Sequence, residues 1–294
     1  EGQRTQLETT NDLDAALHRE FRAFRSTGDG TGKMLVTGYY LPELRGSMKR
    51  EGPFQIPLHA APDDLVTVRA KDFPALSEDL VGKVEKGRLV PYPTRAEIAG
   101  GALAARRAEL LWVDSEVDAF FLEVQGSGVV RFPDGTLRTV TYAGNNGHRY
   151  ESLGAELVRR GAIPREQISM QTIRAWLAAH PEAQRELLDR NPSYVFFRLS
   201  DAAIGALGVP VTTDRSVAAD PRVFPKGGLA FLESERPVDA TPGGPMRPFA
   251  RFVLDQDSGG AIRTSERLDL FLGHGAYAAE AAGRMKQPGR LTYF

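Results

Sequence analysis

Three aspartates in the last third of the chain each lie at the edge of a short hydrophobic segment typical of a β-strand. They are Asp220, Asp257 and Asp269. Burial and nearby like charges both raise a carboxyl pKa, and such segments offer both conditions. An acid that keeps its proton near neutral pH can donate that proton to a leaving group. The pattern therefore favours acid catalysis on an acid-labile bond, with a glycosidic bond as the leading candidate.

Each of these aspartates also has a simpler explanation. Asp269 lies between two leucines, so on a strand its side chain points to the face opposite theirs and can be solvated. Asp257 opens a Ser-Gly-Gly sequence and Asp220 precedes Pro221, and both patterns are typical of turns. A single turn aspartate is ordinary, but three together favour a shared site.

Other catalytic classes find little support. Residues 257–259 read Asp-Ser-Gly, as in aspartic proteases, but that chemistry needs two copies of the motif or a short dimerising chain. There is no Gly-x-Ser-x-Gly motif, and the Gln-Gly-Ser-Gly of residues 125–128 has no nearby base. Because the 5 histidines are scattered and there is no cysteine, we predict neither a metal site nor a cofactor.

The composition is that of a soluble globular protein. Of the 294 residues, 41% are hydrophobic and 26% are charged, which allows a substantial core. The net charge of -1 gives no long-range attraction to nucleic acid, so nucleic acid is not an expected partner. No apolar run approaches the length of a membrane span. The chain begins at Glu1, and we expect that an N-terminal segment such as a targeting sequence has been removed.

Hydrophobic periodicity predicts a helix over residues 11–26 and a strand over residues 34–41 that ends at Pro42. A turn at residues 133–135 predicts two antiparallel strands around it. Helices are predicted over residues 151–160, over 165–179, and from 181 to the residue before Asn191. Strands return at residues 195–197, 228–233, 248–254, 268–272 and 291–294. This order predicts a β domain of residues 1–42 and 197–294, interrupted by an inserted domain of residues 43–196.

Several polar and aromatic segments could line a sugar-binding cleft. Tyr39 and Tyr40 offer flat faces on which sugar rings stack, although core packing is the simpler explanation for at least one of them. Residues 125–128 form either a bulge or turn, or a loop whose glycines let the backbone approach a ligand. Asn145 and Asn146 belong to a turn by default, but Tyr142 nearby suggests that they line the same cleft.

Separated motifs over nearly the whole chain are also those of one known enzyme family. They include Thr37-Gly38-Tyr39-Tyr40, Thr94-Arg95-Ala96-Glu97-Ile98 with Gly101-Ala102-Leu103, Val124-Gln125-Gly126-Ser127-Gly128, Tyr142-Ala143-Gly144-Asn145-Asn146-Gly147-His148, Asn191-Pro192-Ser193-Tyr194 and Asp257-Ser258-Gly259-Gly260-Ala261-Ile262. In this order they resemble the membrane-bound lytic transglycosylase A family, periplasmic enzymes that cleave murein in Gram-negative bacteria.

The resemblance implies a mainly β fold with some helices. Both chain ends would form a double-psi β-barrel, a smaller β-rich domain would be inserted in it, and glycan would bind between the two. The family's catalytic acid falls on Asp269, Asp257 is its neighbour and Thr37 lies close to the acid. The implied substrate-binding residues are Tyr39, Tyr40, Gln125, Gly126, Ser127, Gly128, Asn145, Asn146, Asp220, Gly259 and Gly260.

The implied reaction breaks the β-1,4 bond between N-acetylmuramic acid and N-acetylglucosamine and leaves a 1,6-anhydro-muramyl end. The expected partner is peptidoglycan, and the expected location is the periplasm, with an outer-membrane lipid anchor on the missing N-terminus. Two alternatives stay open: a hydrolysing muramidase or glucanase, and a non-catalytic peptidoglycan-binding module. The chain departs from the family in an extra acid, Asp255, and in Asn145, where some relatives carry lysine.

Overall fold

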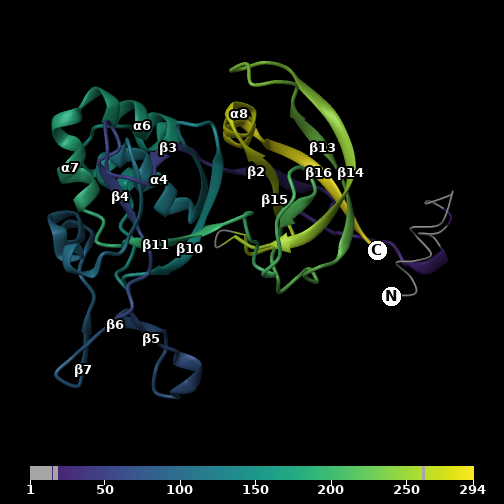
Figure 1. The fold of residues 1–294 in the computed structure, drawn as a ribbon. Coiled ribbons are helices and arrows are strands. Elements are labelled where there is room, and N and C mark those ends of the chain that lie inside the picture. The colour runs from purple at the N-terminus through teal and green to yellow at the C-terminus, as the bar shows by residue number, and fades with distance from the viewer. Residues whose placement is uncertain (1–14, 16–18, 260–261) are drawn as a thin grey trace. The chain divides into compact units, whose positions relative to one another are not determined.

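The chain folds into two compact units in a computed structural model that describes residue 15, residues 19–259 and residues 262–294. Glu1–Leu41 and Ala202–Phe294 make up one unit, and Pro42–Asp201 makes up the other. Most of the regular structure is β-strand, with helices concentrated in the second unit (Figure 1). This confirms the predicted fold class at the level of a mainly β protein with some helices.

The first unit is a closed β-barrel of six strands. They are β2 (Met34–Leu41), β12 (Ser216–Ala218), β13 (Leu229–Pro237), β14 (Met246–Asp257), β15 (Arg267–His274) and β16 (Lys286–Tyr293). Around the barrel the order is β16-β13-β14-β12-β15-β2, and pairing of β16 with β2 closes it. The barrel therefore joins one strand from before residue 42 to five from after residue 201.

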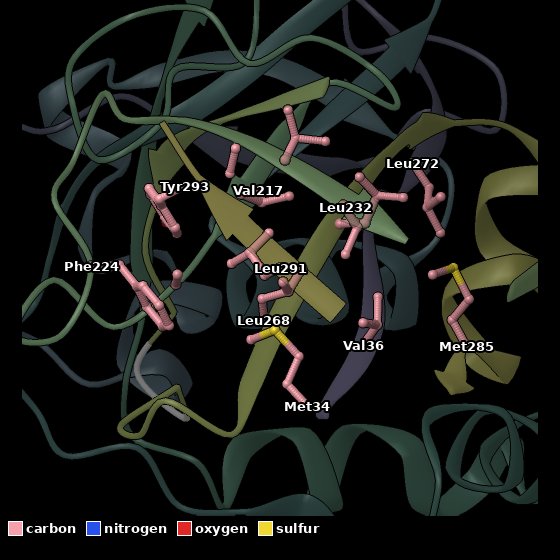
Figure 2. Packing of buried hydrophobic residues seen from close by; sticks show 14 of the residues in the cluster. Met34, Val36, Val217, Phe224, Leu232, Leu268, Leu272, Met285, Leu291 and Tyr293 are labelled. Atoms are coloured by element: carbon pink, nitrogen blue, oxygen red, sulfur yellow. The ribbon is translucent and has the colours of Figure 1, made fainter. Parts of the chain in front are cut away.

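Alternating side chains from these strands fill the barrel (Figure 2). Val36, Val217, Leu232, Leu268 and Leu291 have no exposed surface. Because side chains alternate along a strand, the neighbours of these residues point to the outer face of the barrel wall. The hydrophobic positions therefore determine which polar side chains of β2 and β15 can meet a ligand.

Helix α8 (Ala276–Arg284) packs against β2 and β15, and its Ala278 and Ala281 belong to the barrel core (Figure 1). At Gly38 a β-carbon would lie 2.5 Å from the side chain of Leu272 and 3.2 Å from the Cα of Ala282. These distances leave no room for any other residue, so Gly38 lets the helix approach the strand closely.

The second unit is built on a six-stranded sheet in the order β11-β10-β9-β3-β8-β4. The strands are β3 (Glu43–Ser47), β4 (Ile56–His59), β8 (Glu109–Val113), β9 (Ser127–Arg131), β10 (Leu137–Asn145) and β11 (Val195–Ser200). Strands β9 and β10 form the predicted antiparallel hairpin. A separate three-stranded sheet contains β5 (Val66–Val68), β6 (Leu80–Glu85) and β7 (Arg88–Pro91).

Helices of the second unit enclose a further hydrophobic cluster beside the sheet (Figure 1). They are α4 (Glu116–Gln125), α5 (Leu153–Arg159), α6 (Met170–Ala179) and α7 (Pro181–Asp189), and the short α3 (Arg95–Glu97) contributes no residue to this cluster. The last three of the group occupy the three segments for which helices were predicted. The sequence did not indicate α4, because its Phe- and Val-rich stretch also suits a buried strand.

The predicted helix over residues 11–26 is wrong at its C-terminal end. Phe24–Arg25 is strand β1, which pairs with Thr292 and Tyr293 of β16. Phe24 is 65% exposed, so the expected apolar stripe does not continue into a core. Pairing with the edge of the barrel sheet outweighs the weak helical pattern here. Residues 11–14 and 16–18 of this prediction lie outside the described residues. No helix in the described part of the chain is long and apolar enough to cross a membrane.

His59 in β4 predicts a pH dependence of stability. Burial lowers the pKa of His59 from 6.5 to about 4, against a smaller opposing effect of Glu109. Between these values the unfolded chain binds a proton that the folded chain does not, so stability falls as the pH drops from 6.5 towards 4. We expect the free energy of unfolding of the wild type to fall by roughly 3 kcal/mol more than that of His59→Gln over this range. Urea unfolding at several pH values measures this, and parallel curves for the two proteins would contradict it.

Candidate active site

Two of the three predicted aspartates lie in one row across the barrel wall. Asp257 on β14 and Asp269 on β15 are both register partners of Ala218 on β12, which lies between them. The row continues on β2, where Thr37 is the partner of Asp269. Strands are spaced by about 4.8 Å, so the backbones of the two acids are roughly 10 Å apart with only a small side chain between them.

Asp269 lies at the centre of this row and has two polar partners. The Thr37 hydroxyl donates a hydrogen bond to its Oδ1. The Arg267 guanidinium contacts both carboxylate oxygens, with Nε 3.0 Å from Oδ1 and Nη2 3.2 Å from Oδ2. The Asp269 side chain is 16% exposed, so a ligand can reach it although neighbouring groups fix its position. The resemblance implied Thr37 but not Arg267, which lies two residues from Asp269 on the same face of β15.

Asp257 has a different set of partners. The Tyr39 hydroxyl donates to its Oδ2 at 2.8 Å, and the amides of Ala206 and Ser258 donate to its Oδ1. Burial and the neighbouring acids, Asp257 first among them, raise the pKa of Tyr39, so its hydroxyl stays protonated and acts as a donor. Tyr39 also packs against Phe271 with ring centroids 5.1 Å apart. Tyr39 therefore links the second acid to the strand that carries Thr37.

The contacts of Asp220 are those of a residue that stabilises the fold. It is 1% exposed and accepts hydrogen bonds from the backbone amide and the guanidinium of Arg222. These bonds lower the pKa of Asp220 to about 2, so it is ionised under ordinary conditions. The expectation that such a setting raises a carboxyl pKa is wrong for Asp220, because an adjacent guanidinium compensates its charge.

Asp255, which the sequence marked only as an extra acid, is the most deeply buried carboxylate of this region. Its side chain has no exposed surface and accepts hydrogen bonds from Lys226 Nζ at 2.6 Å and from the Tyr293 hydroxyl at 3.1 Å. Burial raises the pKa of Asp255, whereas Lys226 opposes the shift. The same ammonium donates to the backbone carbonyls of Ala219 and Asp257. Lys226 therefore joins the ends of β12 and β14, directly beside the second acid of the row.

The remaining predicted residues of the barrel unit are less informative. Tyr40 is half-buried and packs against the hydrophobic core, which agrees with the simpler explanation for one of the two tyrosines. A β-carbon at Gly259 would meet the side chain of Ile262 at 3.0 Å, so this glycine allows a tight turn after Asp257. Gly260 lies outside the described residues.

In the second unit, Gln125, Gly126, Ser127 and Gly128 connect a helix to a strand. Gly126 ends α4 in the left-handed conformation with φ 79°, and its amide donates to Leu122. The segment is thus a helix C-cap, not the bulge or turn expected. Gln125 is exposed at this end, whereas Gly128 is buried. A β-carbon at Gly128 would lie 2.4 Å from the Leu122 side chain, so a larger residue does not fit there.

Asn145 and Asn146 differ in whether their side chains can contact a ligand. Asn145 bonds to the Tyr142 hydroxyl at 2.6 Å and to the Gly147 amide, at the C-terminal end of β10. The side chain of Asn146 is 1% exposed and makes four hydrogen bonds to backbone groups of residues 93, 148, 192 and 194. An asparagine amide can form no more than about four such bonds, so Asn146 braces this corner and cannot also bind a sugar.

The barrel row can perform proton transfer with a single acid. Asp269 is partly exposed, oriented by a hydroxyl and paired with a cation, while the Asp257 carboxylate interacts with a phenol donor. Among the described residues, no group of three or more histidines and acids is arranged to hold a metal ion. The arrangement therefore suits acid and base catalysis by side chains.

Sequence and structure comparisons both point to one family. Residues 35–198 match the family described as the MltA specific insert domain, and residues 215–294 match the 3D domain. The membrane-bound lytic murein transglycosylase A of Escherichia coli K12 is 37% identical over 268 residues, and its Vibrio cholerae counterpart is 36% identical over 269. Each alignment covers 90% of this chain, which spans 66% of the length of these curated relatives.

Solved structures of the same family also resemble this chain. MltA from Neisseria gonorrhoeae superimposes with a TM-score of 0.82 at 30% identity, covering 96% of this chain and 77% of that protein. E. coli MltA with bound chitohexaose superimposes with a TM-score of 0.70 at 33% identity, covering 99% of this chain and 80% of that protein.

The buried ion pair beside Asp257 generates a stability prediction. Lys226→Met leaves the Asp255 carboxylate buried without its cation, and we expect it to lower the free energy of unfolding by about 3–5 kcal/mol. Lys226→Met combined with Asp255→Leu removes both charges and should recover most of this loss. Urea unfolding measures both, with Arg159→Met in an exposed helical pair as a control that changes stability by less than about 0.5 kcal/mol. Equal losses in the single and double variants would show that the charge pair is not the cause.

Proposed function

Because this chain belongs to the membrane-bound lytic murein transglycosylase A family, we propose that it cleaves the glycan strands of peptidoglycan by lytic transglycosylation. The observation that carries the proposal is Asp269, a partly exposed acid that is oriented by Thr37 on the wall of a closed barrel. The chitohexaose bound to the E. coli relative supports a glycan as the ligand class.

In the proposed reaction Asp269 acts first as an acid. Its proton passes to the oxygen that links C1 of N-acetylmuramic acid to N-acetylglucosamine, and the C1–O bond breaks. The C6 hydroxyl of the same muramyl residue attacks C1 and closes a 1,6-anhydro ring. The Asp269 carboxylate then accepts the proton of that hydroxyl, which restores the starting protonation state without the addition of water.

One carboxyl group is enough for this chemistry because the nucleophile is part of the substrate. Well-positioned intramolecular reactions gain up to roughly 7–11 kcal/mol from orientation, which replaces a second catalytic carboxylate. The protein then has to orient the acid and stabilise the positive charge that develops on the sugar ring. Thr37 serves the first task, and the Asp257 carboxylate, held by Tyr39, serves the second.

Arg267 has a separate part in the proposed cycle. Its guanidinium contacts both oxygens of Asp269 and so orients the carboxylate that acts as the base in the second half of the reaction. For the first half the carboxyl group must carry a proton, so the ion pair has to weaken when the glycan binds. At 34% exposure the Arg267 side chain has room to move.

Finer features follow from family membership as proposals. The barrel has the double-psi topology, and the second unit is an insertion in it. Besides the barrel residue Tyr39, the exposed Gln125 and the partly buried Asn145 contact the glycan. The protein works in the periplasm and is attached to the outer membrane through a lipid on a preceding segment.

Replacement of the acid tests the proposed reaction. Asp269→Asn removes the proton donor and should lower turnover of purified murein by at least about 100-fold, while glycan binding stays within a few fold of the wild type. Mass spectrometry of the products distinguishes the mechanisms, because an anhydro-muramyl end is one water lighter than a hydrolysed reducing end. Substantial turnover by the variant would move the acid elsewhere, and reducing ends from the wild type would favour a muramidase.

Asp257 should contribute less than Asp269. Asp257→Asn keeps the shape of the side chain but removes the negative charge, so we expect a loss of about 10-fold in kcat with a small change in KM. Tyr39→Phe removes only the hydrogen bond that orients Asp257 and should have a smaller effect in the same direction. A purely structural role would instead lower the unfolding midpoint of both variants and leave kcat of the folded fraction unchanged.

A further inference from the structure

A second candidate binding site lies wholly within the Pro42–Asp201 unit. It is a cavity of about 330 Å³ between strands β4 and β8, the α3 region and helix α4, here named the charged pocket. Residues that the argument uses are Arg50, His59, Arg95, Glu109, Trp112 and Glu123. None of the barrel acids lines it, and neither do the predicted glycan-binding residues 125–128, 145 and 146. Its volume lies within the range of pockets that bind small molecules.

One wall of the pocket comes from residues 94–103, a segment that carries two of the family motifs but takes no part in the proposed reaction. Thr94 caps α3 through a reciprocal hydrogen-bond pattern with Glu97. A wide helical turn then follows at residues 98–102, where Gly101 has φ 100°. A β-carbon at Gly101 would meet nothing within 4 Å, so backbone conformation and not crowding requires glycine there. Turns of this type are frequent at functional sites.

The inner end of the pocket is closed by a buried ion pair. Arg95 contacts both carboxylate oxygens of Glu123, at 3.0 and 2.6 Å, and also bonds to the carbonyls of Asn191 and Ser193. The Val195 amide donates to the same carboxylate. These groups satisfy one another, so Arg95 and Glu123 form a rigid polar end and are not themselves available for a new charge.

His59 adds a neutral polar group to the pocket. Burial lowers its pKa to about 4, so the ring is uncharged near neutral pH. Its Nδ1 lies 2.7 Å from the hydroxyl of the buried Tyr194, which fixes the ring. Within the described residues Nε2 has no hydrogen-bond partner, and the ring can interact with a polar ligand atom without adding charge.

The outer part of the pocket carries charges that the described residues leave uncompensated. Glu109 makes no ion pair or side-chain hydrogen bond with any described residue. Arg50 bonds only through Nε to the Gln55 amide oxygen at 2.9 Å, and it has no carboxylate partner there. Trp112 is half-buried on the same strand as Glu109. An unpaired acid, an unpaired guanidinium and an aromatic face are thus brought together in one cavity.

We propose that the charged pocket binds a peptide side chain that ends in an ammonium and a carboxylate on one carbon. The ammonium would contact Glu109 and the carboxylate would contact Arg50. Trp112 contacts the aliphatic part and adds a cation–π interaction with the ammonium. The guanidinium and carboxylate recognise such a ligand through charge-assisted hydrogen bonds. If the proposed function holds, the source is the peptide stem of peptidoglycan, in which diaminopimelate ends in an ammonium and a carboxylate on one carbon.

Other ligand classes fit less well. An uncharged sugar would desolvate Glu109 and Arg50 without compensating either charge, which is unfavourable. A phosphate or other simple anion would satisfy Arg50 but would be repelled by Glu109. A ligand with one charge of each sign satisfies both groups.

Tryptophan fluorescence offers a direct test, because the chain has 2 tryptophans and only Trp112 lines the pocket. The probe is the tetrapeptide L-alanyl-D-isoglutamyl-diaminopimelyl-D-alanine, acetylated at its first amine so that the diaminopimelate ammonium remains. We expect a saturable fluorescence change in the wild type and in Trp176→Phe, but none in Trp112→Phe. Trp176 of α6 stacks on His180 outside the pocket, so its replacement is the matched control. No saturable change in the wild type, or a change that persists in Trp112→Phe, would overturn the proposal.

Matched ligands then assign the charges. Glu109→Gln should raise Kd about tenfold for the probe, and it should have no effect once the diaminopimelate amine is acetylated. Arg50→Gln should also raise Kd about tenfold, but it should not affect a tetrapeptide with lysine in place of diaminopimelate, which lacks that carboxylate. Glu182→Gln, at an exposed position of α7 outside the pocket, is the control variant. If the losses persist with the modified peptides, the residues do not contact the proposed groups.

The binding test is separate from the test of the reaction. If the peptide binds and murein yields no anhydro product, the proposed reaction fails while the pocket assignment stands. If anhydro product forms and the peptide does not bind, only the pocket assignment fails. Chitohexaose serves as the peptide-free glycan, and a fluorescence change that it causes through Trp112 would make the pocket a sugar subsite and overturn the assignment.

Discussion

The parallel pairing of β2 with β15 is the interaction on which the candidate active site depends. It brings Thr37 beside Asp269 across 232 positions of sequence, and the same register places Leu268 and Val36 in the barrel core. A shift of one residue would turn Asp269 inward and Leu268 outward, at the cost of a buried unpaired carboxylate. The hydrophobic core thus enforces the position of the acid, and the geometry of the candidate site and the stability of the barrel come from one set of contacts.

The two units resemble each other in their use of buried charge. The barrel unit buries Asp255 against Lys226, and the second unit buries Glu123 against Arg95. Such pairs add little net stability, because desolvation offsets most of the attraction between the charges. What each cation does in addition is to bind backbone carbonyls at the ends of neighbouring segments. Both pairs therefore determine where loops begin, close to the acids of the row and to the charged pocket respectively.

Local patterns in the sequence predicted much of the fold but less of the site. Alternating apolar residues indicated β2 and β15, and a Pro-Asp-Gly turn indicated the β9–β10 hairpin, because both signals are local. The patterns could not separate the three aspartates from one another. Arg222 and Arg267 lie two residues from the acids they contact, but the pairing of Lys226 with Asp255 depends on tertiary contacts that no spacing rule gives. The resemblance to a known family singled out Asp269, but Arg267 and the role of Asp255 emerged only from the structure.

The barrel closes only when its last strand is present. Because β16 pairs with both β2 and β13, the chain must be synthesised through residues 286–293 before the wall around Asp269 is continuous. The second unit can form earlier than the barrel, since its strands and helices all come from one uninterrupted stretch. The wall around Asp269 would therefore be completed last, so that a chain ending before residue 286 can fold its second unit without a closed barrel.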